Sequence, residues 1–253
     1  MIRILLTNDD GIDAPGLRAL EAAFDRMDGV ECWTVAPDSQ RSACSHSMSL
    51  GKPVSIQKRG PRRFAHSGVV ADGVYFALVH LMADTRPDLV VAGINSGANL
   101  SEDVIYSGTV AGAREAVLRN VHGLAVSLVS GDDFSHAAPN AAQIAVQIAR
   151  RGGNSPLLFN LNYPAGAFEG PVLCSLGTRP YQPLVRPVAD KGEMAYLLGG
   201  PPVVGVRHEP GTDVALIEQG KASMTPLVIN QTAYGVLEGN QLQFLEGMKV
   251  YHD

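Results

Sequence analysis

Apolar positions along the first half of the chain follow two alternating patterns. Short runs such as 2–7 and 89–94 are apolar almost throughout, which is typical of parallel strands that are covered on both faces. Between such runs apolar residues recur every three or four positions, as at Leu17, Leu20 and Phe24, which predicts helices with one buried stripe. Strands and helices that alternate in this way predict an α/β fold with a doubly wound, mostly parallel sheet and right-handed crossovers.

The pattern also places the individual elements. The predicted strands cover 2–7, 30–36, 54–58, 63–66, 89–94, 124–130 and 156–161. The predicted helices cover 71–82, 110–119 and 138–151, together with one that Asp13 caps and that has Pro15 in its first turn. Two long polar stretches, 37–49 and 95–109, interrupt this order, and long loops in compact domains are often functional.

The pattern changes after Tyr163 and Pro164, where Pro and Gly become frequent and the strands become short. We expect residues 1–164 to form the α/β core and residues 165–253 to form a β-rich elaboration of the sheet, not an independent domain. Within the elaboration, 212–219 is helical and 222–228 is a strand, and an apolar tail follows. We expect this region to act as an arm in oligomerisation.

Composition narrows the class of protein. The 253 residues are 45% hydrophobic and 18% charged, which is enough apolar material for a core and argues against global disorder. A net charge of -5 predicts no stable nucleic-acid complex, and no segment approaches the roughly 20 apolar residues that span a bilayer. The three cysteines, Cys32, Cys44 and Cys174, lie far apart without metal-type spacing, which favours reduced thiols in a cytoplasmic protein.

Polar loops follow three of the predicted strands. Asp9 and Asp10 end the first strand, Ser42 lies in the loop after the second, and Asn95 ends the strand at 89–94. In open α/β sheets ligands bind beyond the carboxyl ends of the strands, so these loops converge if the strands are neighbours. Adjacent carboxylates with neutral oxygen ligands suit Mg²⁺, Mn²⁺ or Ca²⁺ better than zinc. The alternative for Asp9 and Asp10 alone is an ordinary strand-ending turn.

A candidate anion site lies beside this cluster. Ser107, Gly108 and Thr109 directly precede the predicted helix 110–119, and hydroxyls and backbone N–H groups at a helix N-terminus bind anions. The alternative is a simple helix cap by Ser107 or Thr109. A cation next to an anion site favours phosphoryl transfer to water, which needs mainly positioning and charge neutralisation.

Four segments in this order closely resemble the SurE family of stationary-phase survival proteins, which are 5'/3'-nucleotidases. They are 4–17 (ILLTNDDGIDAPGL), 35–42 (VAPDSQRS), 91–100 (VAGINSGANL) and 105–111 (IYSGTVA), with weaker similarity at 160–164 and 223–227. The resemblance implies a Rossmann-like three-layer α/β/α core and a metal-dependent phosphatase that hydrolyses nucleoside 5'- and 3'-monophosphates. It implies one Mg²⁺ or Mn²⁺ ion per subunit, and a homodimer or homotetramer that exchanges C-terminal regions.

The resemblance also implies roles for particular residues. The metal ligands map onto Asp9, Asp10, Ser42 and Asn95, with a metal-activated water as the nucleophile. The phosphate and substrate site maps onto the residues Asn99, Ser107, Gly108 and Thr109.

The chain departs from the family pattern at 68–73, which reads GVVADG and lacks the usual hydroxyl and proline. We expect a less rigid helix start there and a possible change in substrate preference. His46 is the one titratable base in the Ser42 loop, and we hypothesise that it contacts the substrate or protonates the leaving group. The alternative is a loop hydrogen bond. Cys44 is expected to be a small packed side chain and not a catalytic thiol.

Rival functions stay open at this point. A broader phosphomonoesterase or polyphosphatase would use the same groups, and a non-catalytic nucleotide-sensing module would keep the pocket without turnover. A dinucleotide oxidoreductase is disfavoured, because no GxGxxG follows the first strand and two carboxylates there would repel a pyrophosphate. A haloacid-dehalogenase phosphatase is disfavoured because its Asp-x-Asp motif is missing near that strand.

Overall fold

The structure is a computed structural model that describes residues 1–151, 153, 155–190 and 193–237. The apolar tail residues Leu242, Phe244 and Leu245 lie outside the described residues.

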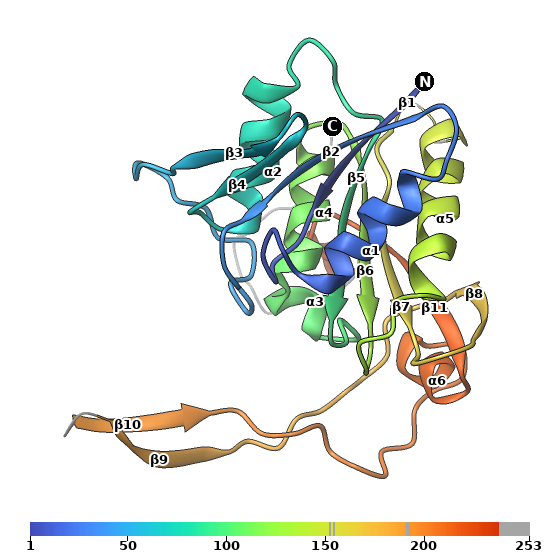
Figure 1. Ribbon diagram of the computed structural model, residues 1–253. Helices are drawn as coiled ribbons and strands as arrows, with labels where there is room; N and C mark the ends of the chain where they lie inside the picture. Colours follow the sequence, from blue (N-terminus) through green and yellow to red (C-terminus); the bar gives the residue numbers. More distant parts are fainter. Residues whose placement is uncertain (152, 154, 191–192, 238–253) are drawn as a thin grey trace.

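A large mixed sheet forms the centre of the molecule (Figure 1). Its nine strands lie in the order β3-β4-β2-β1-β5-β6-β7-β11-β8. Their bounds are Ile2–Thr7 (β1), Val30–Pro37 (β2), Ile56–Gly60 (β3), Arg63–His66 (β4), Leu89–Ser96 (β5), His122–Leu128 (β6), Leu158–Tyr163 (β7), Glu169–Leu173 (β8) and Lys221–Leu227 (β11). The pairs from β4 to β7 are parallel, whereas β3 with β4 and β7 with β11 are antiparallel.

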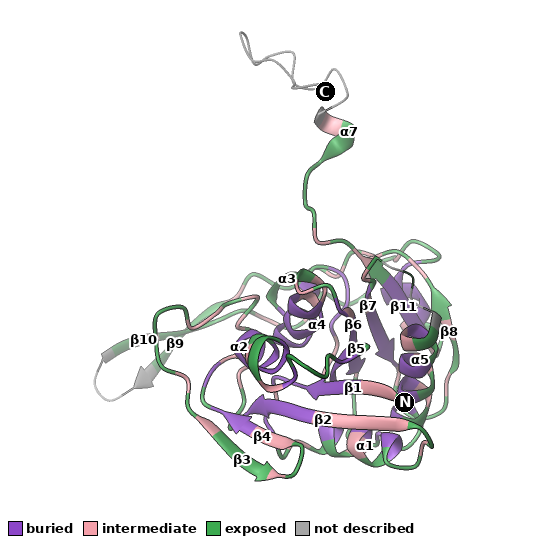
Figure 2. Cartoon of the chain, turned by 90° about the horizontal axis from the view of Figure 1, so that it is seen from above, coloured by how far each residue is buried: buried purple, intermediate pink, exposed green. Residues whose placement is uncertain are grey.

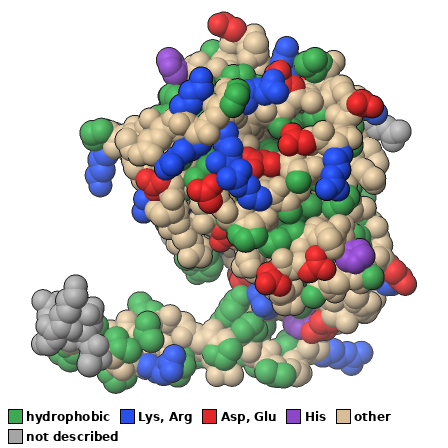
Figure 3. All heavy atoms as spheres, viewed as in Figure 1, with side chains coloured by type: hydrophobic (Ala, Val, Ile, Leu, Met, Phe, Trp, Pro, Cys, Tyr) green, Lys and Arg blue, Asp and Glu red, His purple; other side chains and the backbone are tan. Residues whose placement is uncertain are grey.

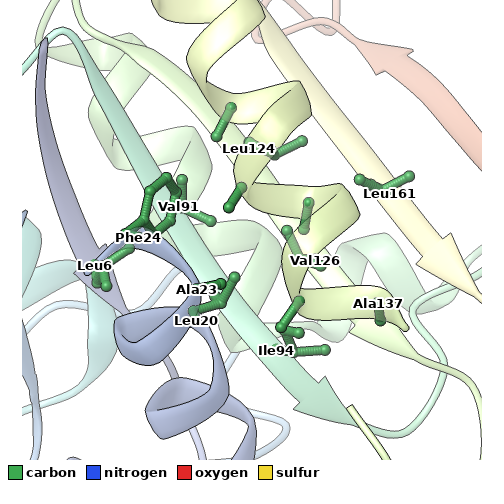
Figure 4. Packing of buried hydrophobic residues seen from close by; sticks show 14 of the residues in the cluster. Leu6, Leu20, Ala23, Phe24, Val91, Ile94, Leu124, Val126, Ala137 and Leu161 are labelled. Atoms are coloured by element: carbon green, nitrogen blue, oxygen red, sulfur yellow. The ribbon is translucent and has the colours of Figure 1, made fainter. Parts of the chain in front are cut away.

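Helices cover both faces of the sheet and make a three-layer α/β/α arrangement (Figure 1). The helices are Pro15–Phe24 (α1), Val70–Phe76 (α2) continued by the π-helix Ala77–Leu81 (η1), Asp103–Tyr106 (α3), Gly108–Leu118 (α4), Ala137–Arg151 (α5), Asp213–Glu218 (α6) and Tyr234–Leu237 (α7). On one face α1 and α5 bury residues such as Phe24 and Leu20 against Val91 and Val126 (Figure 4). On the other face α2 and α4 pack over β5 and its neighbours. The predicted α/β class is therefore confirmed.

Two local predictions need correction. Asp13 does not cap α1, because Ala14 holds the N-cap position without a side-chain hydrogen bond. The Asp13 carboxylate instead forms ion pairs with Arg18 and Arg63. The predicted helix 71–82 is α-helical only to Phe76 and then widens into the π-helix, after which Met82 leaves helical geometry.

The C-terminal part of the chain adds to the sheet and also extends away from it. β11 and β8 join the edge of the sheet beyond β7, whereas Val185–Asp190 (β9) and Glu193–Leu198 (β10) pair as a hairpin that projects from the body (Figures 1 and 2). Apolar side chains stay exposed along this arm (Figure 3). Met194 and Leu198 are among them. None of the helices in the described part of the chain has the length and apolar character that crossing a membrane requires.

Candidate active site

The three polar loops meet because their strands are neighbours. β1 pairs with β2 on one side and with β5 on the other, and all three run parallel. Their carboxyl ends therefore open onto the same edge of the sheet, beside α4. A cavity of about 290 Å³ lies there, and its lining residues are Asp9, Asp10, Gln40, Ser42, Ala43, Asn95, Ser96, Ala98, Asn99, Asp103, Tyr106, Ser107 and Tyr181.

Asp9 is the most buried acid of this cavity, with only 4% of its surface exposed. Its carboxylate accepts a hydrogen bond from the Thr109 hydroxyl at the start of α4. Burial raises the pKa of Asp9 from 3.8 to about 6, opposed by the Thr109 hydrogen bond and reinforced by the adjacent charge of Asp10. A buried carboxylate with a raised pKa gains strongly from a nearby cation, as a metal ligand does.

Asp10 reaches the same cavity from a less buried position. Its Oδ2 accepts a hydrogen bond of 3.1 Å from the backbone N–H of Ser96, which ties the end of β1 to the end of β5. Burial raises the pKa of this carboxyl as well. Two partly desolvated acids that are adjacent in sequence repel each other unless a proton or a cation lies between them.

Two neutral oxygen donors complete the candidate metal ligands. Asn95 donates from Nδ2 to the carbonyl of Gly97 at 2.9 Å, so its Oδ1 is the amide atom that can act as a ligand. The Ser42 hydroxyl, which lines the cavity from the loop after β2, accepts from Gln40 Nε2 at 3.0 Å. The structure therefore brings all four sequence-predicted ligands to one cavity.

This donor set fits a hard divalent ion. In the part of the chain that the structure describes, no group of three or more His, Cys, Asp or Glu side chains gathers as a metal site. The candidate ligands are instead two carboxylates with an amide and a hydroxyl oxygen, a combination that suits Mg²⁺ or Mn²⁺ and not zinc.

The start of α4 borders the cavity. Ser107 caps the helix, since its hydroxyl accepts from the Val110 N–H at 3.0 Å. Gly108 permits close packing at this point, because a Cβ there would lie 2.9 Å from Asp9 Oδ2. The helix-cap interpretation of Ser107 is confirmed, and Ser107 also lines the cavity, so a role in anion binding stays a prediction. Thr109 contacts Asp9 directly and is fully buried.

Asn99 is fixed by a buried polar network. Its Nδ2 donates to Ser127 Oγ at 2.8 Å, and its backbone N–H donates to Asn162 Oδ1 at 3.0 Å. Its carbonyl accepts from the side chains of Asn160 and Asn162. The side chain is buried in this network, although the residue borders the cavity, so the loop after β5 is held rigidly in place.

His46 does not line the cavity. Its Nε2 lies 3.0 Å from Glu115 Oε2 on α4, the kind of loop hydrogen bond that the alternative interpretation describes. Arg119 also contacts Glu115, at 2.9 Å. Burial alone would raise the pKa of Glu115, but hydrogen bonds from His46 and Arg119 hold that pKa below its ordinary value. His46 thus fastens the Ser42 loop to α4.

The departure at 68–73 does not leave the start of α2 without hydrogen bonds. Asp72 accepts from the Val69 N–H at 2.9 Å, and also from the Ser49 N–H and hydroxyl at 2.8 and 2.7 Å. The expected loosening of this helix start therefore finds no support, because one buried carboxylate joins α2 to the loop after β2.

Seven residues of the cavity wall are not among the predicted site residues: Gln40, Ala43, Ser96, Ala98, Asp103, Tyr106 and Tyr181. Asp103 and Tyr106 lie on α3, a one-turn helix inside a stretch that was predicted to be loop. Tyr181 comes from the C-terminal part of the chain and reaches the cavity through contacts with Asp103. No local pattern links residues 78 positions apart, so only the fold shows this contact.

The chain is similar to known proteins over most of its length. Residues 4–183 match the family model described as Survival protein SurE. The chain belongs to the SurE family. A 5'-nucleotidase SurE from Anaeromyxobacter sp. (strain Fw109-5) is 42% identical over 244 residues, which are 94% of each chain. A 5'-nucleotidase SurE from Vibrio campbellii is 40% identical over 239 residues, covering 92% of this chain and 91% of the relative.

The family fold is shared as well. The crystal structure of the SurE protein from Aquifex aeolicus superposes with a TM-score of 0.83 at 30% identity, and covers 96% of this chain and 99% of its own. The structural similarity therefore extends over almost the whole chain.

Proposed function

We propose that this chain is a divalent-metal-dependent 5'-nucleotidase that hydrolyses nucleoside 5'-monophosphates, and also 3'-monophosphates, to nucleoside and phosphate. The observation that carries the proposal is the buried Asp9 carboxylate, which sits beside Asp10 in one cavity with the capped start of α4. That arrangement supports a cation bound next to the phosphate. The relatives named 5'-nucleotidase SurE support the choice of substrate.

Each group has a distinct role in the proposed reaction. Asp9, Asp10, Ser42 and Asn95 would hold one Mg²⁺ or Mn²⁺ ion. When bound, such an ion polarises a phosphoryl oxygen and lowers the pKa of a coordinated water. Ser107 and the backbone at the start of α4 orient the phosphate, and Thr109 orients Asp9 through its hydrogen bond.

We also propose that the protein works in the cytoplasm as a homodimer or homotetramer. All three cysteines are free thiols, as expected in a reducing compartment. The exposed apolar side chains of the β9–β10 arm form a surface that a second subunit would cover. Light scattering on the full chain and on a variant with the apolar Met194 and Leu198 replaced by Ser tests this assembly, and a monomeric wild-type protein would refute it.

The decisive experiment measures phosphate release from 5'- and 3'-mononucleotides with Mn²⁺, Mg²⁺ or EDTA. We expect release that requires metal and that Asp9→Asn abolishes. Asp84→Asn is the matched control, because it removes an exposed acid outside the cavity. Full activity in EDTA would refute the metal assignment.

The panel also separates the rival functions. Equal turnover of p-nitrophenyl phosphate and of short polyphosphate would favour a broader phosphomonoesterase. Tight nucleotide binding without any release would favour a nucleotide-sensing module.

A further inference from the structure

The cavity has a polar end and an aromatic side. Most of its lining residues are small or polar, such as Ser96, Ala98 and Ala43. Among the described lining residues, Tyr106 and Tyr181 carry the only aromatic rings. Both residues are exposed, 66% for Tyr106 and 43% for Tyr181. Exposed aromatic surface facing a ligand cavity is available for stacking.

Tyr181 is held in place before any ligand arrives. Its hydroxyl donates to Asp103 Oδ1 at 2.7 Å and accepts from Arg179 Nη1 at 2.6 Å. Arg179 also pairs with the other Asp103 oxygen at 2.7 Å, so the three side chains form a closed network. Burial and the hydrogen bond to Asp103 raise the pKa of Tyr181 to about 12, which keeps the phenol a neutral donor.

The backbone around Tyr181 is fixed as well. The segment lies at the base of the β9–β10 arm, where the two sides of the arm pair with each other. Gln182 donates its N–H to the Pro201 carbonyl at 3.0 Å, and Val203 donates to the Pro180 carbonyl at 2.8 Å. A ring that is anchored at its hydroxyl and at its backbone loses little conformational freedom when a ligand stacks on it.

A guanidinium lies over one face of the ring, so a base would stack on the opposite face. The Arg179 guanidinium carbon lies 5.3 Å from the Tyr181 ring centroid, within cation–π range. Nucleobases stack on aromatic side chains in an arrangement that tolerates differences in sequence, because every base has a π-face. Phosphate groups and simple sugars have no π-face with which to stack on the ring.

We propose that Tyr181 is the nucleobase-stacking residue of this cavity and makes the protein prefer nucleoside monophosphates to phosphomonoesters without a base. The proposal rests on the proposed function, since it assumes that the phosphate lies at the Ser107 and Asp9 end. The side of the cavity formed by Asp103 and Tyr181 then receives the base. The contribution comes from the C-terminal part of the chain, so residues outside the predicted core select the substrate.

The test compares kcat/KM for 5'-AMP with that for ribose 5-phosphate in Tyr181→Ala, Tyr181→Phe and wild type. Loss of one base–aromatic contact corresponds to roughly 5- to 150-fold in affinity. We expect Tyr181→Ala to lower the preference for 5'-AMP over ribose 5-phosphate by about tenfold or more, mainly through KM. Tyr181→Phe keeps the ring and should keep most of that preference.

Tyr75→Ala is a matched control. Tyr75 is 38% exposed and has the Arg119 guanidinium 4.6 Å from its ring centroid, but it lies outside this cavity. The Tyr75→Ala variant therefore loses the same kind of ring and the same kind of cation–π contact as Tyr181→Ala. An equal fall in preference in Tyr75→Ala would overturn the proposal, as would an unchanged preference in Tyr181→Ala.

A second measurement separates this proposal from the proposed function. Adenosine binding in EDTA, followed by calorimetry, reports on the base site without turnover. Weaker binding to Tyr181→Ala than to Tyr181→Phe supports the stacking site even if no phosphate is released from any substrate. Equal adenosine binding by wild type, Tyr181→Phe and Tyr181→Ala would overturn the stacking site even if the nucleotidase activity is present.

Discussion

Replacing Asp9 with Asn should remove activity and at the same time stabilise the metal-free fold. Asp9 is 4% exposed, and its pKa is raised from 3.8 to about 6. An acid whose pKa is higher in the folded than in the unfolded state binds its proton more tightly in the folded protein. Its ionisation therefore lowers the free energy of unfolding as the pH rises from the unfolded-state pKa to the folded-state pKa. The cost is roughly 3 kcal/mol at pH 8 and about half of that at pH 5.

An Asn side chain carries no charge and keeps an oxygen that can accept from Thr109. The Asp9→Asn variant should therefore gain up to about 3 kcal/mol over wild type at pH 8, and clearly less at pH 5. Trp33 is the only tryptophan and lies in β2. Its fluorescence can follow urea unfolding in EDTA at both pH values, with Asp84→Asn as the control.

Metal addition gives the complementary result. Mn²⁺ should stabilise wild type by mass action and leave Asp9→Asn nearly unchanged. A variant that is destabilised equally at pH 5 and pH 8, or that gains the same amount at both, would refute the reasoning, because neither result is expected from the desolvated charge of Asp9.

Three further predictions concern the surroundings of the site. Gly16→Ala places a Cβ 2.0 Å from the carbonyl oxygen of Ile94 in β5, so we expect urea unfolding to show a loss of about 3 kcal/mol in unfolding free energy. Gly153→Ala is the control, because its Cβ meets nothing within 4 Å and the change should be neutral. Burial lowers the pKa of His66 from 6.5 to about 4, so the folded wild type should lose up to about 3 kcal/mol of unfolding free energy as the pH falls through this range. His66→Leu should lose less, which unfolding curves at pH 7 and pH 4.5 can measure. His46→Ala removes one hydrogen-bond partner of Glu115 and should cost about 1 to 3 kcal/mol of stability. The pH profile of kcat/KM should keep its shape, whereas loss of one limb of that profile would support a proton-transfer role for His46.

Sequence pattern located the strands of the core well. The strand at 2–7 matches β1 at both ends, and the strand at 89–94 lies within β5, because strands covered on both faces leave continuous apolar runs. The pattern predicts the ends of helices and strands less accurately where contacts with distant residues decide them. Asp13 has the chemistry of a helix cap, yet ion pairs with Arg18 and Arg63 take its carboxylate elsewhere.

The sequence by itself determined the α/β class and the strand-end acids Asp9 and Asp10, because these are local features, whereas Ser42 and Asn95 were assigned as ligands by the resemblance to the SurE family. The short α3 inside a long polar loop was not visible in the same way, since one helical turn leaves almost no periodic signal.

Only the tertiary structure decided how the ligands meet and what surrounds them. The strand order puts β1 between β2 and β5, which brings Asp9, Ser42 and Asn95 to one cavity. The burial that raises the pKa of Asp9 is likewise a property of the packed chain, and so is the opposing hydrogen bond from Thr109, which is distant in sequence. Tyr181 reaches the cavity for the same reason: contacts between distant segments follow from how elements pack, and no local pattern in the sequence encodes them.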